Sequence, residues 1–138
     1  MTSPRKTIRN AARSTLVVST PTRHWTYLPA WSQSVDRDAL PVYSVATPRT
    51  ITVKIDKDSD EDRIDLLVIF KIIGGDDLED LVDDHVAAIV ALLLPALSPL
   101  SLQPELTLTE INIDGDGAQR VATAVITMTV PVQTPAII

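Results

Sequence analysis

The two histidines are the first residues to consider for chemistry, because imidazole is the side chain whose charge changes most readily near neutral pH. His24 stands next to Trp25 in a stretch rich in Pro, Ser and Thr, whereas His85 stands next to Val86 in an apolar-periodic stretch. The sequence contains no His-x-x-x-His pair for zinc and no elbow motif that would present a nucleophilic serine. We therefore expect a partly buried structural role for His85, no catalytic residues, and a protein that is not an enzyme.

Carboxylates are the second candidates, because alternating acidic residues can ligate a cation. Residues 56–60 alternate as they do in a calcium loop, but that loop requires Gly at its sixth position and Glu at its twelfth, where this chain has Glu61 and Leu67. The other acidic run, 114–117, has the Asp-Gly composition of a hairpin turn. We predict a solvated turn at both places, with weak cation binding as the alternative at each.

Other cofactors lack the residues that usually bind them. The chain has no cysteine, and its four glycines form two close pairs that match neither a dinucleotide-binding loop nor a P-loop. No metal site, no cofactor and no cofactor-binding residue are therefore expected.

Charge is distributed unevenly along the chain, whose net charge is −6. The part before the first acidic residue, Asp36, is purely basic, with Arg5, Lys6, Arg9, Arg13 and Arg23. From 56 to 84 the chain is strongly acidic. Such a split can attract the basic part of one copy to the acidic part of another, and it argues against a broad face that grips nucleic acid. The alternative is two charged surfaces that face only solvent.

Length and composition indicate one domain, 1–138. A chain of 138 residues with 45% hydrophobic residues has the size and apolar content of a single core. We divide it into a basic helix with an irregular segment, 1–39, and a sheet and helix core, 40–138. The longest apolar stretch, 86–97, is shorter than the about 20 residues that cross a bilayer. Pro95 also interrupts it, so no membrane association is expected.

The N-terminal third is expected to hold one short helix. Ser3-Pro4 is a typical helix start, and apolar residues then recur at helical spacing, which predicts a helix over 4–16. Residues 17–46 carry both tryptophans and should be irregular, with extended pieces near 23–28 and 42–46. This segment should either fold over the core or offer a sticky surface to a partner.

The middle of the chain predicts a hairpin and a helix. Strict alternation over 50–55 and a longer apolar run over 63–73 indicate two antiparallel strands, the second one central and covered on both faces. Apolar residues at three- and four-residue steps predict an amphipathic helix over 78–94, capped by the preceding aspartates and stopped by Pro95.

The last third predicts two more strands, 105–114 and 119–132. In the first, the buried face should switch between Thr109 and Glu110, which a β-bulge there would explain. The second should be half exposed or lie at an edge. The expected fold is therefore α+β: a mainly antiparallel sheet of four to five strands, with a long amphipathic helix and a short N-terminal helix packed on one face.

This order of elements resembles the tail terminator (tail-completion) proteins of long-tailed bacteriophages. The resemblance covers the chain from Leu40 onward, about two thirds of it. The segments that carry it are Asp62-Arg63-Ile64-Asp65-Leu66-Leu67-Val68-Ile69-Phe70-Lys71, Asp76 to Leu94, Leu108-Thr109-Glu110-Ile111-Asn112-Ile113-Asp114-Gly115-Asp116-Gly117, and Val121 to Val132. Pro41-Val42-Tyr43-Ser44-Val45 is similar to the short strand that precedes the hairpin in that family, whereas the loop with Trp25 and Trp31 has no counterpart.

The resemblance implies a structural virion protein at the head-proximal end of the tail. Copies of the chain, six by this resemblance, would close into a homohexameric ring that ends tail-tube polymerisation and joins the tail to the head connector. Its implied partners are itself, the tail tube protein, and a head-completion or connector protein. DNA would pass through the channel without specific binding, and assembly would take place in the host cytoplasm.

A ring needs two different surfaces on each subunit that fit one another. We hypothesise that Arg5, Arg9 and Arg13 of one copy meet an acidic set on the next, and that the contact weakens with salt. The acidic set is Asp58, Asp60, Glu61, Asp76 and Glu79. Acidic loops could instead face the channel and keep DNA from adhering.

Three other functions stay open at this stage. The chain could be another head–tail adaptor, ring stopper or tail-tube component of the same virion. It could also be a small ferredoxin-like enzyme or ligand-binding module, or a general interaction domain.

Overall fold

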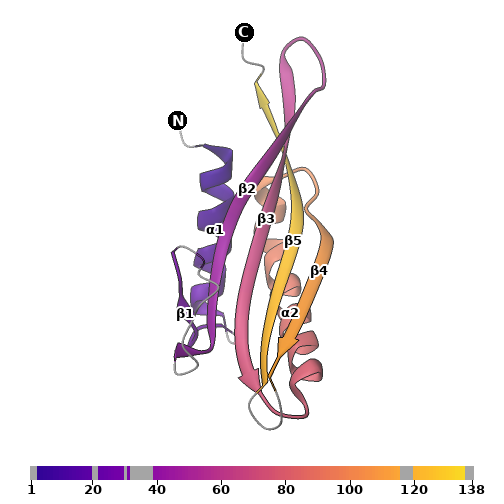
Figure 1. The fold of residues 1–138 in the computed structure, drawn as a ribbon. Helices are drawn as coiled ribbons and strands as arrows, with labels where there is room; N and C mark the ends of the chain where they lie inside the picture. Colours follow the sequence, from indigo (N-terminus) through magenta and orange to yellow (C-terminus); the bar gives the residue numbers. More distant parts are fainter. Residues whose placement is uncertain (1–2, 20–21, 30, 32–38, 116–119, 136–138) are drawn as a thin grey trace.

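The computed structural model describes residues 3–19, 22–29, 31, 39–115 and 120–135, and it shows two helices packed on one face of a five-stranded sheet (Figure 1). The elements in chain order are α1 (Pro4–Val18), β1 (Thr26–Tyr27), β2 (Val42–Lys54), β3 (Ser59–Gly74), α2 (Leu78–Leu97), the 3-10 turn η2 (Ser98–Leu100), β4 (Glu105–Asp114) and β5 (Arg120–Pro135). The strand order is β1-β2-β3-β5-β4, with one parallel pair, β1–β2, and antiparallel pairs elsewhere. The predicted fold class is confirmed.

The core lies between the sheet and the helices. Every second residue of β3 from Ile64 to Ile72 is buried. The register places the small Ala124 of β5 opposite Phe70, so that the aromatic ring of Phe70 has room beneath the helices. The buried helix residues recur at intervals of four or seven, which keeps them on one side: Ile8, Ala12 and Leu16 of α1, and Leu78, Val82, Ile89, Leu93 and Leu97 of α2. The helical spacing predicted from the sequence is confirmed.

Strand β2 is longer than predicted, because it joins two segments that the sequence analysis separated. It runs from Val42 through the predicted strand at 50–55, and its register with β3 shifts between Ala46 and Arg49. Pro48 lies at this shift, where a missing backbone N–H does not break the ladder. The extended piece predicted near 42–46 and the strand predicted over 50–55 are therefore parts of one strand, with an irregularity at Pro48.

Among the described residues, helices cover one face of the sheet only, so the second cover predicted for the central strand β3 is not a helix, although Ile69 on that face is buried. Figure 1 views the other face, with both helices behind the sheet. We call it the open face. Leu67 and Ile69 of β3 lie on it, and the same register places Ile51 of β2 there, 47% exposed.

Helix α2 continues through Pro95, contrary to the prediction that this proline stops it. Pro95 lies in the last turn with its ring exposed, and a single backbone hydrogen bond is lost there, while Leu97 beyond it is fully buried. Asp77 is the N-cap residue, but its side chain makes no capping hydrogen bond, so the predicted aspartate cap was wrong in that detail. Glu79 and Asp80 do occupy the first turn, where acids suit the helix dipole.

The length argument against a membrane span was also wrong. Residues 78–100 form a segment long and apolar enough to cross a bilayer, with a mean hydropathy of 1.7. It is the one such helix in the part of the chain that the structure describes. Its buried residues face the sheet and its first half is acidic, so we interpret α2 as the core helix.

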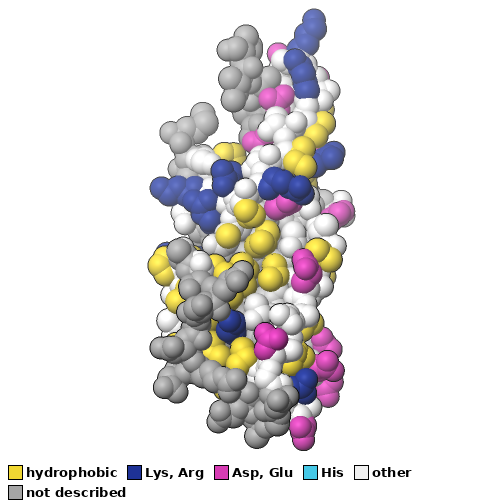
Figure 2. All heavy atoms as spheres, viewed as in Figure 1, with side chains coloured by type: hydrophobic (Ala, Val, Ile, Leu, Met, Phe, Trp, Pro, Cys, Tyr) yellow, Lys and Arg dark blue, Asp and Glu magenta, His cyan; other side chains and the backbone are white. Residues whose placement is uncertain are grey.

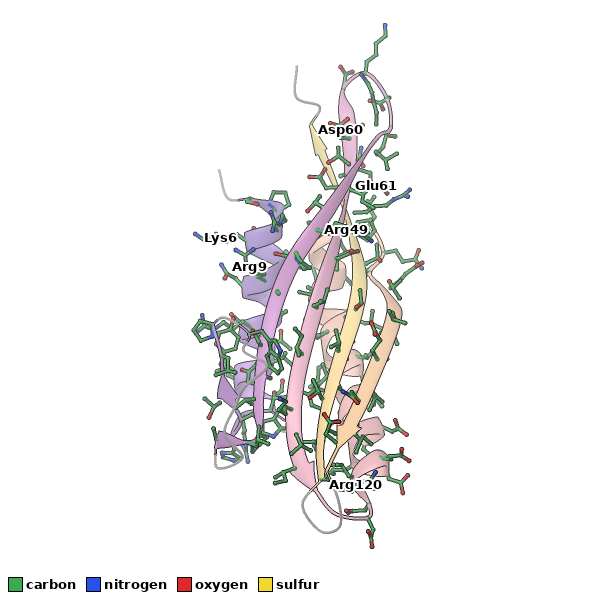
Figure 3. The ribbon with its side chains drawn as sticks, viewed as in Figure 1. Lys6, Arg9, Arg49, Asp60, Glu61 and Arg120 are labelled. Carbon is green, nitrogen blue, oxygen red and sulfur yellow. The ribbon has the colours of Figure 1, made fainter. Side chains whose placement is uncertain are left out.

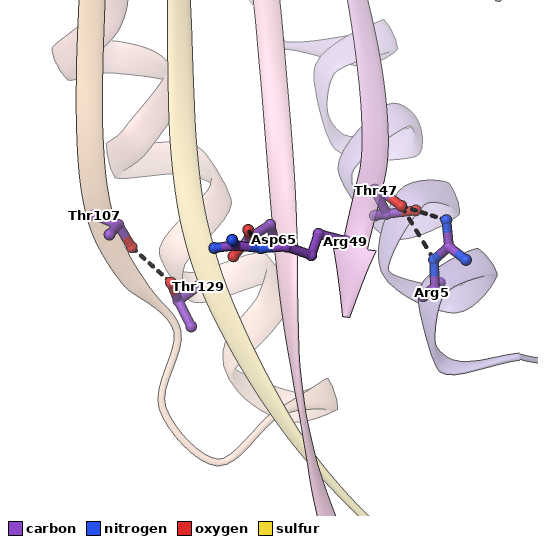
Figure 4. Close-up of polar contacts among 6 residues, drawn as sticks. All are labelled: Arg5, Thr47, Arg49, Asp65, Thr107 and Thr129. Carbon is purple, nitrogen blue, oxygen red and sulfur yellow. Dashed lines mark hydrogen bonds and ion pairs between the residues drawn. The ribbon is translucent and has the colours of Figure 1, made fainter. Parts of the chain in front are cut away.

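Strand β4 has its bulge at a different place from the one predicted. The register with β5 shifts between Leu106 and Leu108, not at Thr109 and Glu110, and it leaves Thr107 free to bond Thr129 across the sheet, Oγ1 to Oγ1, over 2.7 Å (Figure 4). Strand β5 is interior, between β3 and β4, rather than at an edge. Gly115 has a positive φ of 99°, as Asp-Gly hairpin turns require. Residues 116–119 of that turn lie outside the described residues.

Candidate assembly surfaces

His85 is a packing residue, as predicted. Its ring lies 4.9 Å from the ring of Trp25 and 6.2 Å from the ring of Phe70, both in edge contacts. Burial lowers the pKa of His85 below its ordinary value, and the Asp84 carboxylate partly opposes this effect. The segment with Trp25 therefore folds over the core, which is the first of the two outcomes predicted for it.

The acidic turn between β2 and β3 is organised by its own hydrogen bonds. The Asp56 carboxylate accepts from the backbone N–H of Asp58 over 2.8 Å, from the N–H of Ser59 over 2.9 Å, and from the Ser59 hydroxyl over 3.0 Å. These bonds, the one from Asp58 first, lower the pKa of Asp56. Among the described residues no three His, Asp or Glu side chains are placed to hold a metal ion.

The three arginines of the hypothesised interface make contacts within the subunit. The Nε and Nη2 atoms of Arg5 donate to the carbonyl of Thr47, with Nε at 3.1 Å (Figure 4), and Nη1 of Arg9 donates to the Thr47 hydroxyl over 2.7 Å. The guanidinium carbon of Arg13 lies 4.2 Å from the centre of the Tyr27 ring. These groups tie α1 to β1 and β2, a role for which the sequence contains no local signal.

The acidic members of that hypothesis do not form one surface. Asp58, Asp60 and Glu61 belong to the β2–β3 hairpin, at one end of the sheet, and Glu61 binds Arg63 over 2.8 Å. Asp76 and Glu79 belong to the start of α2, at the other end. Figure 3 shows the separation, because Asp60 and Glu61 are labelled at the hairpin and Arg120, which pairs with the last residue of β3, is labelled at the far end.

Opposite sides of the sheet carry opposite charge. We call one side the basic flank. It is made by α1 and β2, which contain no acidic residue, and its cationic residues are Arg5, Lys6, Arg9, Arg13, Arg49 and Lys54. We call the other side the acidic flank. It is made by α2 and β4, which contain no Lys or Arg, and its acidic residues are Glu79, Asp80, Asp83, Asp84, Glu105, Glu110 and Asp114. Every one of these acidic side chains is exposed.

The flanks are separated by β3 and β5, which lie between β2 and β4. In Figure 2 Lys and Arg side chains are most frequent on the left and at the top, where a few acidic side chains lie among them, and Asp and Glu are most frequent along the right-hand and lower margin, where a few Lys and Arg side chains also appear. On the basic flank Arg49 binds Asp65 of β3 over 2.8 Å but stays 67% exposed (Figure 4). The molecule is therefore electrostatically polar across the width of its sheet.

Two hollows border the acidic flank. One, of about 370 Å³, is lined by Glu79 and Asp83 of α2 and by Ile111 and Ile113 of β4, so it combines carboxylates with apolar side chains. The larger, of about 510 Å³, lies on the open face, with Trp31 over Leu67 and Ile69 of β3 and with Lys71, Glu110, Ile111, Asn112, Asp114, Thr123 and Val125 around them. The sequence analysis missed both, because neither is contiguous in sequence.

No model of a known protein family matches the chain, and a search of curated proteins finds no relative that matches it.

Proposed function

We propose that this chain is a structural subunit of a bacteriophage virion that assembles head to tail into a ring, which ends tail-tube polymerisation and joins the tail to the head connector. The observation that carries the proposal is the opposite charge of the two flanks. A flank of one sign repels an identical flank, so two copies are not expected to join by a symmetric contact between equal flanks. The basic flank of one copy fits the acidic flank of the next, which is a head-to-tail contact.

Head-to-tail contacts lead to a ring where the rotation between neighbours closes. The resemblance of residues 40–138 to tail terminators selects a closed ring, by that resemblance a homohexamer, over a filament. The resemblance also implies a sheet with helices packed on one side, and the fold of the chain, with α1 and α2 on one face of its sheet, supports the proposal.

The partners follow from this position in the virion. One rim of the ring binds the tail tube protein and the other binds a head-completion or connector protein. The channel passes DNA without specific binding, because a subunit with a net charge of −6 gives a phosphate backbone little to hold. No catalytic residue, cofactor or membrane takes part, and the protein works at the head-proximal end of the tail after assembly in the host cytoplasm.

The test combines mass and microscopy. Light scattering at low and high ionic strength should show a closed oligomer that dissociates as salt rises, because exposed charges are screened over roughly 8 Å at physiological salt. Electron microscopy of the protein mixed with tail tubes should show one ring at one tube end. Rings stacked along the tube would identify a tube component, and rings that bind only the head connector would identify a ring stopper or adaptor. A monomer at every concentration would overturn the proposal.

A further inference from the structure

Strand β4 presents a free sheet edge. It pairs with β5 on one side only, and within the described residues no strand lies on its other side. Natural edge strands are usually shortened, or protected by charged residues, proline, a β-bulge or a covering segment, and of these β4 has its acidic residues and the register shift between Leu106 and Leu108. The ten residues of β4 contain neither Lys nor Pro, and Leu106, Leu108 and Ile111 are 45%, 50% and 42% exposed.

The opposite edge of the sheet is open only in part. Strand β1 pairs with β2 at Val42 and Tyr43 alone, and Arg5 occupies the carbonyl of Thr47. From Arg49 to Lys54 the described residues place no strand on the outer side of β2. This free part carries Arg49 and Lys54 and no acidic residue, although its partner residues on β3 include Asp60, Glu61, Asp62 and Asp65.

The two free edges run in opposite directions. Strands β2, β3, β5 and β4 are neighbours in that order and each pair is antiparallel, so β4 runs against β2 (Figure 1). A second copy can be placed beside the first by rotation about an axis roughly along the strands. The β2 of the second copy then lies antiparallel to the β4 of the first. This is the pairing that the sheet already uses at three of its four internal contacts.

We infer that the occupant of the β4 edge is a second copy of this chain, whose β2 segment Arg49–Lys54 pairs with β4 in antiparallel fashion and continues the sheet from subunit to subunit. Charge selects this partner, because Glu105 and Glu110 of β4 then lie near Arg49 and Lys54. The inference rests on the proposed function and names the surfaces that join its subunits.

The two edges are offset along the strands, and the offset has a geometric meaning. Strand β4 pairs with residues 121–129 of β5. Residues Arg49–Lys54 pair with residues 60–65 of β3, which in turn pair with residues 129–134 of β5. The two free edges therefore lie at different heights along the strands. Pairing them shifts each copy along the strand direction relative to its neighbour. In a closed ring such a stagger requires strands inclined to the ring axis, as in any closed sheet.

Proline substitution tests the inference. Adjacent residues of an antiparallel edge strand direct their N–H groups to opposite sides, so one of Glu110→Pro and Ile111→Pro removes an outward donor and the other removes a bond to β5. We expect the outward variant to melt within a few degrees of the native chain and to remain a monomer by native mass spectrometry. If the variant that keeps its melting temperature assembles as the native chain does, the inference is wrong.

Amide hydrogen exchange supplies a second readout that does not depend on any variant. In the assembled native protein, exchange in 105–114 and in 49–54 should slow by about tenfold or more relative to the monomer obtained at high dilution. An oligomer in which neither segment gains protection would overturn the edge pairing and leave the ring proposal standing. A native chain that never assembles would overturn both.

Discussion

Thr47 is the residue that holds two arginines of α1 in contacts within the subunit. Its carbonyl and hydroxyl accept hydrogen bonds from Arg5 and Arg9, although it lies 42 and 38 residues away from them in sequence. Hydrogen bonds that involve a charged group contribute about 1.5–3 kcal/mol. Two of the three arginines predicted for a subunit interface therefore act first as clamps between α1 and β2.

Replacement of one clamp tests this role. Arg5→Ala should lower the free energy of unfolding by about 1–2 kcal/mol, because both of its bonds to the Thr47 carbonyl are lost. The matched control is Lys6→Ala, whose side chain is exposed on the outer side of the same helix (Figure 3), and it should change stability by less than about 0.5 kcal/mol. Urea denaturation followed by circular dichroism measures both. Equal losses for the two variants would contradict the assignment.

His85 gives the fold a pH-dependent component. Burial against Trp25 and Phe70 lowers its pKa in the folded chain below the ordinary 6.5, so the unfolded chain binds the proton more readily. The contribution of neutral His85 is fully present above about pH 6.5, and it is lost as the pH falls from there through the folded-state pKa. Melting temperatures between pH 7.5 and 5.0 should decrease more steeply for the native chain than for His85→Gln. Parallel curves would show that the histidine does not titrate with folding.

At the scale of elements, the spacing of apolar residues in the sequence predicted which face of each helix and strand is buried. The alternating residues of β3 and β5 and the three- and four-residue steps of both helices defined the faces that meet in the core, and those faces are buried as expected. The errors fall where a local breaker was outweighed by distant packing. Leu97 keeps α2 helical past Pro95, and pairing with β3 keeps β2 extended past Pro48.

The candidate surfaces were less predictable, because they depend on strand order. The sequence shows a basic start and an acidic middle, but only the sheet order separates β2 from β4 and so creates opposite flanks. Neither the clamp at Thr47 nor the edge at β4 has a local signal. The acidic hairpin and the start of α2, which appeared as one acidic region in sequence, lie at opposite ends of the sheet.

The hairpin end of the sheet has the least packing and should be the least protected part of it. No residue from 48 to 63 is buried, and Ile51 and Ile55 are 47% and 50% exposed. Hydrogen exchange in the monomer should therefore be faster in 51–62 than in 64–72 by about tenfold or more. Equal protection of the two segments would show that the hairpin is as firmly held as the core.

At the scale of the whole molecule, the account rests on one asymmetry. Residues 72–119 contain no Lys or Arg, and residues 1–35 contain no Asp or Glu, so the fold turns a sequence pattern into two flanks of opposite sign. Such a subunit is expected to bind its neighbour in one orientation, because a reversed neighbour brings equal charges together.

Mixing two charge-altered variants tests this claim most directly. The first variant, Glu105→Lys with Glu110→Lys, replaces two negative charges of the acidic flank with positive ones. The second variant, Lys6→Glu with Lys54→Glu, replaces two positive charges of the basic flank with negative ones. All four side chains are exposed. Native mass spectrometry at low salt should show that each variant alone stays monomeric. An equal mixture should form closed oligomers with the two variants in equal number. Oligomers from either variant alone, or a mixture that stays monomeric while the native chain assembles, would contradict head-to-tail assembly through these flanks.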